Sequence, residues 1–330
     1  MTGGNDRMWG VLIHLGMNQW HDHFMSEIKR AGVWAKCPGE EYLDHIRAQY
    51  CTADHVRFDE AVWREVSARY AECGVNTIVL DLGEAVAYPS RPELAVKGSW
   101  APEKLRAELD RLRGMGFEVV PKLNFSTSHD AWLKDYHRMV STDEYYDVCS
   151  DVIRDACEIF GGPRLFHIGF DEERPQHHKN DQIAIARQGM LWWHDLKFLS
   201  SQVESRGART WMWVDHIVKD SGRTLVYDNL PKSVLVSPWY YQDVFDPGET
   251  WEIKAMHDLD AHGYDMVPCG STCFFTDDSM ERLSAYCEAR FNRSRLKGYL
   301  CAPWLEMCEY FKPRLLLAGE STGRARRACL

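Results

Sequence analysis

The stretch Leu165-Phe166-His167-Ile168-Gly169-Phe170-Asp171-Glu172-Glu173 begins as an apolar run and ends in carboxylates. An apolar run of this length predicts a strand of a parallel sheet, because such strands are covered on both faces. Side chains alternate along a strand, so His167, Gly169 and Asp171 are expected on one face, toward a central cavity. Asp171 and Glu172 would then end the strand as adjacent carboxylates, which are costly to bury unless they are paired or used. They indicate either a functional site or a solvated acidic turn.

The composition narrows the class of protein. A chain of 330 residues suits one large α/β domain or two medium ones. The net charge of -10 argues against a nucleic-acid partner, because binding to phosphates needs a basic face. No apolar run reaches the roughly 20 residues of a membrane span, so no membrane partner is expected. The thirteen Trp and fourteen Tyr suit either a large core or a carbohydrate site.

Localisation and metal binding follow from weaker signals. Met1–Asn5 is short and polar and has no signal-peptide pattern, unless an upstream signal has been removed. The eleven cysteines are scattered without a CxxC pair, which favours reduced core cysteines in a cytoplasmic protein. His21 and His23 raise the possibility of a metal-dependent amidohydrolase barrel, but no ligand set with metal spacing accompanies them. We therefore predict neither a metal site nor a cofactor.

Strand and helix patterns alternate along the chain. The predicted strands are Trp9–Gly16, Asn76–Gly83, Glu118–Asn124, the stretch quoted above, Arg209–Asp215, Val234–Tyr241, Asp265–Cys269 and Gly298–Trp304. The predicted helices are Asp59–Glu72, Pro102–Arg113, one from Ser141 and Glu144 through Ile159, about Asp181–Ser205, Trp251–His262, and one from Asp278 and Glu281 to about Phe291. About eight alternations without a linker predict an α/β fold, a single (β/α)8 TIM barrel over residues 1–330. A doubly wound open sheet is the alternative, although no GxGxxG motif or P-loop is present.

Two segments depart from this regular pattern. The first βα loop, at about residues 17–57, is too long for an ordinary connector, and long loops in compact domains are often functional. After the eighth strand we expect one short helical segment and then a short, frayed, basic tail that includes Arg324–Arg327.

The candidate site follows from the barrel, because barrel enzymes place their sites at the C-terminal ends of the strands. Those ends carry carboxylates, aromatic rings, an amide and histidines, which suit a polyol-binding cavity with acid/base groups and a carbohydrate substrate. The residues are His14, Asp81, Asn124, His129, Asp171, Glu172, Trp213, Asp215, Trp239, Tyr240, Tyr241, Trp304 and Glu306.

Several motifs in order resemble one known family. His167-Ile168-Gly169-Phe170-Asp171-Glu172 resembles the His-x-Gly-Gly-Asp-Glu motif of glycoside hydrolase family 20, the β-N-acetylhexosaminidases. Pro121–Asn124 with the following His129 resembles that family's strand and Pro-Gly-His loop. Trp211–Asp215 resembles its tryptophan-rich strand, and Trp304–Glu306 its closing Trp-x-Glu. The resemblance spans roughly residues 76–306.

The resemblance implies an exo-acting, retaining hydrolase in which the 2-acetamido group of the substrate is the nucleophile. Glu172 would be the general acid and then the base for water. Asp171 would orient the acetamido group, and His129 would tune or hold the carboxylate pair. Because Glu172 adjoins another carboxylate in an apolar wall, we expect its pKa to be raised, as an acid working near neutral pH requires.

The resemblance also implies binding roles. One of Tyr240 and Tyr241 would hydrogen-bond the acetamido oxygen, and the sequence does not choose between them. The expected walls and hydroxyl ligands are Trp213, Trp239, Trp304, Glu306 and Asp81. Of the pair Trp211 and Trp213, we expect only one to face the cavity.

Five departures from the family pattern keep alternatives open. Phe170 replaces the second Gly of the motif, and Lys122 and Asn124 stand at acidic positions. The loop before His129 lacks the Pro-Gly, and His14 stands where an arginine is expected. One alternative is a glycosidase for a sugar without an acetamido group, which would need a further carboxylate such as Asp215 or Glu306. The other is a sugar-binding barrel without activity.

Three neighbouring residue groups are expected to lie outside the chemistry. His167 is predicted to brace the barrel interior, since buried histidines usually find structural partners. His177-His178 is predicted to be a solvated loop. Glu173 is predicted to be a solvated neighbour or a partner of Arg174.

Overall fold

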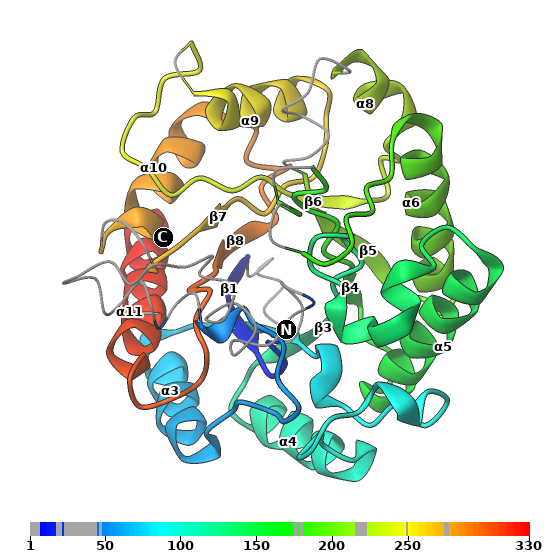
Figure 1. Ribbon diagram of the computed structural model, residues 1–330. Coiled ribbons are helices and arrows are strands. Elements are labelled where there is room, and N and C mark those ends of the chain that lie inside the picture. Colours follow the sequence, from blue (N-terminus) through cyan, green and yellow to red (C-terminus); the bar gives the residue numbers. More distant parts are fainter. Residues whose placement is uncertain are drawn as a thin grey trace, which may run out of the picture.

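The chain folds as a (β/α)8 barrel, which confirms the predicted fold class (Figure 1). The computed structural model describes residues 7–17, 22, 45, 48–174, 177–178, 181–214, 223–248, 250–273 and 277–330. The strands run in the order β6-β5-β4-β3-β2-β1-β8-β7, and every pair is parallel. The helices surround the strands on the outside of the barrel (Figure 1).

The strands are shorter than the sequence predicts. They are β1 Met8–His14, β2 Thr77–Asp81, β3 Glu118–Lys122, β4 Leu165–His167, β5 Arg209–Trp213, β6 Leu235–Ser237, β7 Cys269–Gly270 and β8 Gly298–Cys301. Parallel bridges from Val236 to Met266 and from Trp239 to Cys269 join β6 to β7 and complete the ring.

Most of the described helices match predicted ones. They are α3 Glu60–Cys73, α4 Pro102–Gly114, α5 Asp143–Ile159, α6 Gly189–Glu204, α8 Arg223–Asn229, α9 Trp251–Ala261, α10 Ser279–Arg290 and α11 Lys312–Cys329. Three 3-10 helices are η1 Gly83–Ala85, η2 Pro92–Leu94 and η3 Ala131–Arg138. The α8 helix was not predicted. In the part of the chain described here, no helix is long and apolar enough to cross a membrane.

The helix ends test the capping predictions. Asp59 caps α3 by accepting from the amides of Ala61 and Val62, and Gly74 ends it with a φ of 85°. The predicted capping box of Ser141 is wrong, because Thr142 caps α5, while the Ser141 hydroxyl donates to Asp195.

The second predicted capping box is also wrong. The carboxylate of Asp278 makes no capping bond to α10 and accepts from the Arg282 side chain instead. The spacing therefore identifies Asp278 correctly as the N-cap residue of α10, although neither predicted capping box forms.

The C-terminal segment differs from the expected frayed tail. Residues 324–327 belong to α11, which has 18 residues and packs against α3 and α10. The Tyr70 hydroxyl donates to the carbonyl of Leu315 at 2.8 Å. A Cβ at Gly319 would lie 2.2 Å from Cδ1 of Tyr70, so the missing side chain lets α3 and α11 approach closely. This packing stabilises the helix that the polar sequence pattern did not reveal.

A single register layer crosses five strands inside the barrel. His14 pairs with Asp81, Asp81 with Lys122, Lys122 with His167, and His167 with Trp211. Paired residues of neighbouring strands point to the same face of a sheet. All five side chains are buried. Four of them are polar or charged, so this layer must satisfy its own hydrogen bonds and charges.

An ion pair satisfies the charge in this layer. The Lys122 Nζ lies 2.5 Å from Oδ2 of Asp81, and Nδ1 of His14 lies 3.2 Å from the same oxygen. Burial alone would raise the pKa of Asp81, but Lys122 and His14 outweigh it and hold that pKa below its ordinary value. Burial lowers the pKa of His14, which favours a neutral ring.

We predict that Lys122→Met destabilises the protein by about 3–5 kcal/mol at pH 7, because it leaves the Asp81 carboxylate buried without its cation. The double variant Asp81→Asn/Lys122→Met should recover much of this loss, since no buried charge remains. Urea unfolding of the three proteins measures the difference.

The stability difference between the wild type and Lys122→Met should change with pH in one direction. Asp81 has a lowered pKa when folded, so its contribution is present above its ordinary value of 3.8 and is lost as the pH falls through the folded value. The gap between wild type and Lys122→Met should therefore narrow in acid. Equal stability of the two proteins at pH 7 would contradict the role of the pair.

Candidate functional site

A cavity of about 190 Å³ opens where several strands end. Its lining residues are Tyr50, Asp171, Glu172, Trp213, Trp239, Tyr241 and Trp304. Six of these seven were predicted from strand ends, and Tyr50 comes from the long first βα loop. The volume lies below the roughly 300–1,000 Å³ of pockets for drug-sized ligands, so the described residues enclose room for one small ring.

The end of β4 turns sharply toward this cavity. Gly169, Phe170 and Glu172 have φ values of 68°, 73° and 56°, which explains why the regular strand ends at His167. A Cβ at Gly169 would lie 2.0 Å from Oδ1 of Asn124 and 2.8 Å from its Cα. Glycine is therefore required at position 169 by both its backbone angle and its neighbour.

Asn124 uses the space that Gly169 leaves. Its Oδ1 accepts from the backbone amides of Ser126 at 3.0 Å and Phe170 at 3.2 Å. Its Nδ2 donates to Oδ1 of Asp171 at 3.0 Å. Because the two amide donors fix the orientation of the side chain, the NH2 group must face Asp171. Asn124 thus holds the carboxylate and the turn before it together.

His129 contacts both carboxylates of the motif. Its Nε2 lies 3.3 Å from Oε2 of Glu172 and 3.6 Å from Oδ2 of Asp171. Burial acts to lower the pKa of His129, but the charges of Asp171 and Glu172 outweigh it and raise that pKa. The predicted position of His129 beside the pair is therefore found.

The expectation that Glu172 has a raised pKa is wrong for this arrangement. Burial does act to raise the pKa of Glu172, but the hydrogen bond and the positive charge of His129 outweigh it, and the pKa is lowered. The sequence placed Glu172 beside Asp171, but it could not give the distance to His129. The proton of this pair is therefore held mainly on His129.

The two histidines after the motif are not a solvated loop. The backbone carbonyl of Glu172 contacts Nδ1 of His177, whose Nε2 lies 3.9 Å from Oε1 of Glu172. His178 is buried, and its Nδ1 lies 3.2 Å from Oδ2 of Asp181. His177 thus packs beside Glu172, and His178 is held by Asp181.

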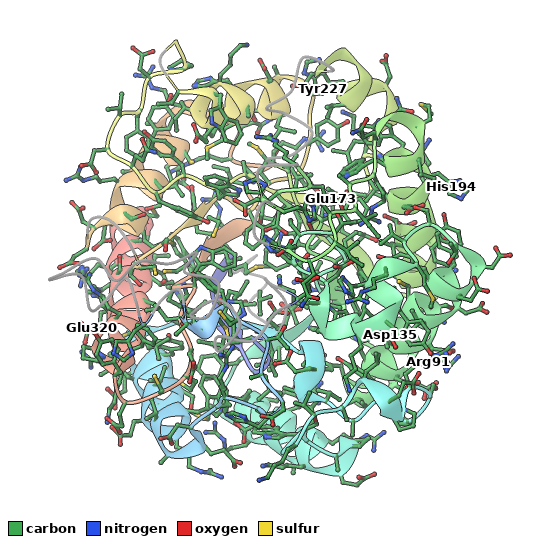
Figure 2. The ribbon with its side chains drawn as sticks, viewed as in Figure 1. Arg91, Asp135, Glu173, His194, Tyr227 and Glu320 are labelled. Atoms are coloured by element: carbon green, nitrogen blue, oxygen red, sulfur yellow. The ribbon has the colours of Figure 1, made fainter. Side chains whose placement is uncertain are left out.

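Glu173 is also buried rather than solvated, and it lies inside the ring of helices (Figure 2). Its carboxylate pairs with Arg187 and accepts from the amide of Thr127 at 2.9 Å. The Nη1 of Arg187 also lies 3.2 Å from Oδ2 of Asp195. Arg187 is therefore the partner of Glu173 rather than the Arg174 that the sequence suggests. No sequence signal marks Arg187, because it follows no strand and is 14 residues from Glu173.

Arg187 also supports the residue that replaces a glycine in the family motif. Its Cζ lies 4.4 Å from the centre of the Phe170 ring, and the Trp192 ring lies 4.8 Å from that ring. Phe170 therefore faces the helices, as alternation predicts. A positive φ costs a residue with a side chain roughly 1–3 kcal/mol, so these contacts must hold Phe170 in place.

Aromatic rings form the walls of the cavity. The rings of Trp213 and Trp304 are 5.6 Å apart, and those of Trp239 and Tyr241 are stacked at 5.1 Å. The Nε1 of Trp304 donates to the Tyr241 hydroxyl at 3.1 Å. The Tyr240 hydroxyl instead donates to the carbonyl of Val244, so Tyr241 lines the cavity and Tyr240 does not.

Trp211 and Trp213 both lie inside the barrel, contrary to the expectation that only one would. Their rings lie 5.0 and 4.7 Å from that of His167. Residues two apart in a strand share a face, which is why both point inward. Only Trp213, which is two residues nearer the strand end, lines the cavity. His167 is fully buried, and its Nδ1 accepts from the amide of Gly169, as expected for a brace.

The first βα loop holds the β8 end of the site. Gln49 Nε2 donates to the carbonyl of Trp304 at 2.8 Å, and the Tyr50 hydroxyl donates to it at 3.2 Å. The amide of Glu306 donates to Gln49 Oε1 at 2.7 Å. The Glu306 carboxylate lies 3.9 Å from Arg57 and is not among the residues that line the cavity.

The remaining predicted residues lie beneath or outside the described site. His14 and Lys122 both contact Asp81, and neither His14 nor Asp81 lines the cavity. The ring of His14 is 5.8 Å from that of Trp304, so the layer of the ion pair supports the cavity from below. His21, His23 and Asp215 lie outside the described residues. Within the described ranges, no three His, Cys, Asp or Glu side chains form a group that could hold a metal ion.

Comparisons with known proteins match the chain only at the level of structure. No protein-family model and no curated protein matches it. A β-N-acetylhexosaminidase from Bacteroides fragilis has a similar structure, with a TM-score of 0.63 and 14% identity over 96% of this chain and 65% of that chain. A chitobiase from Flavobacterium johnsoniae has a TM-score of 0.60 and 17% identity over 82% and 46% of the two chains.

A family 20 β-N-acetylhexosaminidase from Streptomyces coelicolor has a TM-score of 0.58 and 16% identity over 82% of this chain and 62% of that chain. The chain therefore spans between about half and two thirds of these three proteins. At such low identity the likeness shows the fold alone. The chain has the fold of the barrel of glycoside hydrolase family 20, as the motif resemblance implied.

We predict that Arg187→Met destabilises the protein by about 3–5 kcal/mol, because it leaves the buried carboxylates of Glu173 and Asp195 without their shared cation. Arg106→Met is the matched control, since Arg106 is 48% exposed and its pair with Glu103 is worth about 0–1 kcal/mol. Urea unfolding at pH 7 compares the two variants. Similar losses in both would show that Arg187 has no special role.

We predict that His129→Gln raises the pKa of Glu172, because burial then acts without the opposing charge. The measurement is a carbon NMR titration of glutamate-labelled protein, with the Glu172 signal assigned by its loss in Glu172→Gln. An unchanged Glu172 titration in His129→Gln would contradict the pairing.

The same pair gives stability in a defined pH window. The lowered pKa of Glu172 contributes stability above its ordinary value of 4.5, which is lost as the pH falls through the folded value. The raised pKa of His129 contributes stability below its ordinary value of 6.5, which is lost as the pH rises through the folded value. The stability that His129→Gln loses should therefore be largest between these two values.

Proposed function

We propose that this protein is an exo-acting, retaining β-N-acetylhexosaminidase that uses the 2-acetamido group of its substrate as the nucleophile. The observation that carries the proposal is the carboxylate pair of Asp171 and Glu172. Asn124 and His129 hold this pair at an aromatic cavity sized for one ring. The barrel fold and the ordered family motifs support the same assignment.

In the first step, the acetamido oxygen attacks the anomeric carbon and the bond to the leaving oxygen breaks. Glu172 gives a proton to that oxygen. Asp171 accepts a hydrogen bond from the acetamido N–H and balances the charge that grows on the resulting oxazolinium ring. Asn124 donates to Oδ1 of Asp171, so the acetamido N–H bonds to Oδ2, the oxygen that also lies 3.6 Å from Nε2 of His129.

In the second step, the Glu172 carboxylate takes a proton from water, and that water attacks the anomeric carbon and opens the ring with retention. Tyr241 serves the acetamido oxygen, because its hydroxyl lies in the cavity lining, where it accepts from Trp304. Trp213 and Trp239 pack against the substrate. Tyr50 closes the same wall from the first βα loop.

His129 keeps the needed proton in the site. The pKa of His129 is raised and that of Glu172 is lowered. At any pH between these two pKa values, the two side chains together hold one proton. The first step moves that proton to the leaving oxygen through Glu172. Activity should therefore decline as the pH rises through the pKa of His129.

The alternative glycosidase without an acetamido nucleophile needs another carboxylate at the anomeric carbon. Glu306 lies beside Arg57 and does not line the described cavity. Asp171 and Glu172 are adjacent in sequence and share His129, so they do not face each other across a substrate. These contacts favour the substrate-assisted mechanism.

We predict that Glu172→Gln lowers the hydrolysis of aryl β-N-acetylglucosaminides and galactosaminides by about 10²–10⁴-fold. The loss should be greater for a poor leaving group than for nitrophenol, because only the poor leaving group needs a proton. Asp171→Asn should slow both substrates alike, since it acts on the acetamido group. A thiazoline mimic of the oxazolinium ring should inhibit the wild type.

Two outcomes would overturn the proposal. If an aryl glucoside without the acetamido group is cleaved equally well, the protein is a glycosidase of the alternative kind. If the folded wild type cleaves none of these substrates, the barrel binds sugar without catalysis, and sugar binding by Glu172→Gln would be measured next. Glu309→Gln, an exposed carboxylate beside α11, is the control variant and should keep full activity.

A further inference from the structure

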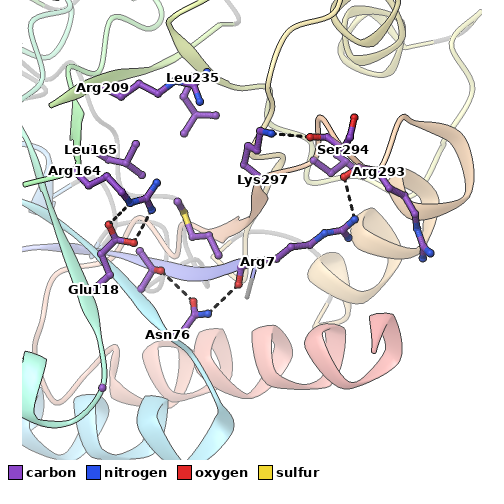
Figure 3. A pocket seen from close by; sticks show the side chains of 14 residues that line it. Arg7, Asn76, Glu118, Arg164, Leu165, Arg209, Leu235, Arg293, Ser294 and Lys297 are labelled. Carbon is purple, nitrogen blue, oxygen red and sulfur yellow. Dashed lines mark hydrogen bonds and ion pairs between the residues drawn. The ribbon is translucent and has the colours of Figure 1, made fainter. Parts of the chain in front are cut away.

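A second and larger hollow lies at the opposite end of the barrel, where the strands begin (Figure 3). Its volume is about 700 Å³, within the roughly 300–1,000 Å³ of pockets that bind small ligands. Five cationic side chains and one carboxylate are among its lining residues, which include Arg7, Arg164, Arg209, Arg293, Lys297 and Glu118. This concentration of positive charge stands out in a chain with a net charge of -10.

The carboxylate of Asp265 pairs with three neighbouring cations. Asp265 lies 3.0 Å from Arg209, 3.3 Å from Arg295 and 3.5 Å from Lys297. A single negative charge cannot neutralise three positive ones. This side of the hollow therefore keeps an excess of positive charge.

The other side of the hollow is arranged in a similar way. Glu288 pairs with both Arg7 and Arg293, the latter at 2.7 Å. Glu118 pairs with Arg164 at 2.8 Å. Five of these cations line the hollow and Arg295 does not, so against the three carboxylates the lining cations keep an excess of two positive charges.

Some of these contacts brace the barrel. Arg209 Nε donates to the carbonyl of Ser233, and Arg7 Nη2 donates to that of Arg293 at 3.2 Å. A purely structural role explains these bonds but not the excess charge, because repulsion between cations destabilises the fold. Arg164 and Arg293 are 66% and 65% exposed, so their guanidinium groups remain accessible at the hollow.

We propose that this hollow binds a small polyanion that carries two or more phosphate or sulfate groups. Guanidinium groups bind such oxyanions through paired N–H donors, and several of them surround one space here. One excess charge lies on each side of the 700 Å³ hollow, so one ligand with separate anionic groups matches it better than a single monoanion. The site is independent of the proposed hydrolase function, since it lies at the other end of the strands.

The test is isothermal titration of the protein with tripolyphosphate, a disulfated disaccharide, inorganic phosphate and inorganic sulfate at fixed salt. The variant is Arg164→Gln/Arg293→Gln, chosen because both side chains are exposed and their loss should leave the fold intact. The matched control is Arg69→Gln/Arg106→Gln, which removes the same charge from side chains that are 44% and 48% exposed. Thermal unfolding confirms that each variant is folded.

We expect one of the two polyanions to bind at least tenfold more weakly to the hollow variant and unchanged to the control. The preferred polyanion then shows whether the anionic group is phosphate or sulfate. Binding should weaken as the salt concentration rises. The proposal is overturned if neither polyanion binds the wild type, if both double variants weaken binding equally, or if the monoanions bind as tightly as the polyanions.

Discussion

The ion pair between Lys122 and Asp81 is the constraint on which the site depends. It lies in the register layer that runs from His14 on β1 to Trp211 on β5, and it joins β2 to β3 while His14 of β1 contacts the same carboxylate. The pair fills the barrel beneath the cavity with charge rather than with apolar side chains. Its desolvation cost is offset only while the strands keep this register, which ties the geometry of the strand ends to the stability of the barrel.

The residues two positions beyond this register layer form part of the site. Asn124 lies two residues beyond Lys122, Gly169 two beyond His167, and Trp213 two beyond Trp211, so all three point inward. Gly169 has no side chain because the Asn124 amide needs its space to reach Asp171. Gly169 and Asn124 therefore depend on each other, because the Asn124 side chain holds the Asp171 carboxylate only while position 169 has no side chain.

The sequence predicted those parts of the molecule that follow from local pattern. Alternating strands and helices gave the barrel, and strand ends gave six of the seven lining residues. It did not predict Arg187 or Tyr50, because neither follows a strand and their contacts come from distant loops. The lowered pKa of Glu172 was missed for the same reason, since it depends on a distance to His129 that no spacing contains.

Phe170 shows how a departure from a motif can be accommodated. Its φ of 73° is the backbone angle that glycine adopts most readily, which gives a physical reason for the glycine in the family motif. Arg187 packs on the Phe170 ring and also neutralises Glu173, so one buried cation holds the residues on both sides of Asp171 and Glu172. The strain of the turn and the charge of the loop are therefore balanced by the same side chain, and a substitution at position 170 cannot be judged apart from position 187.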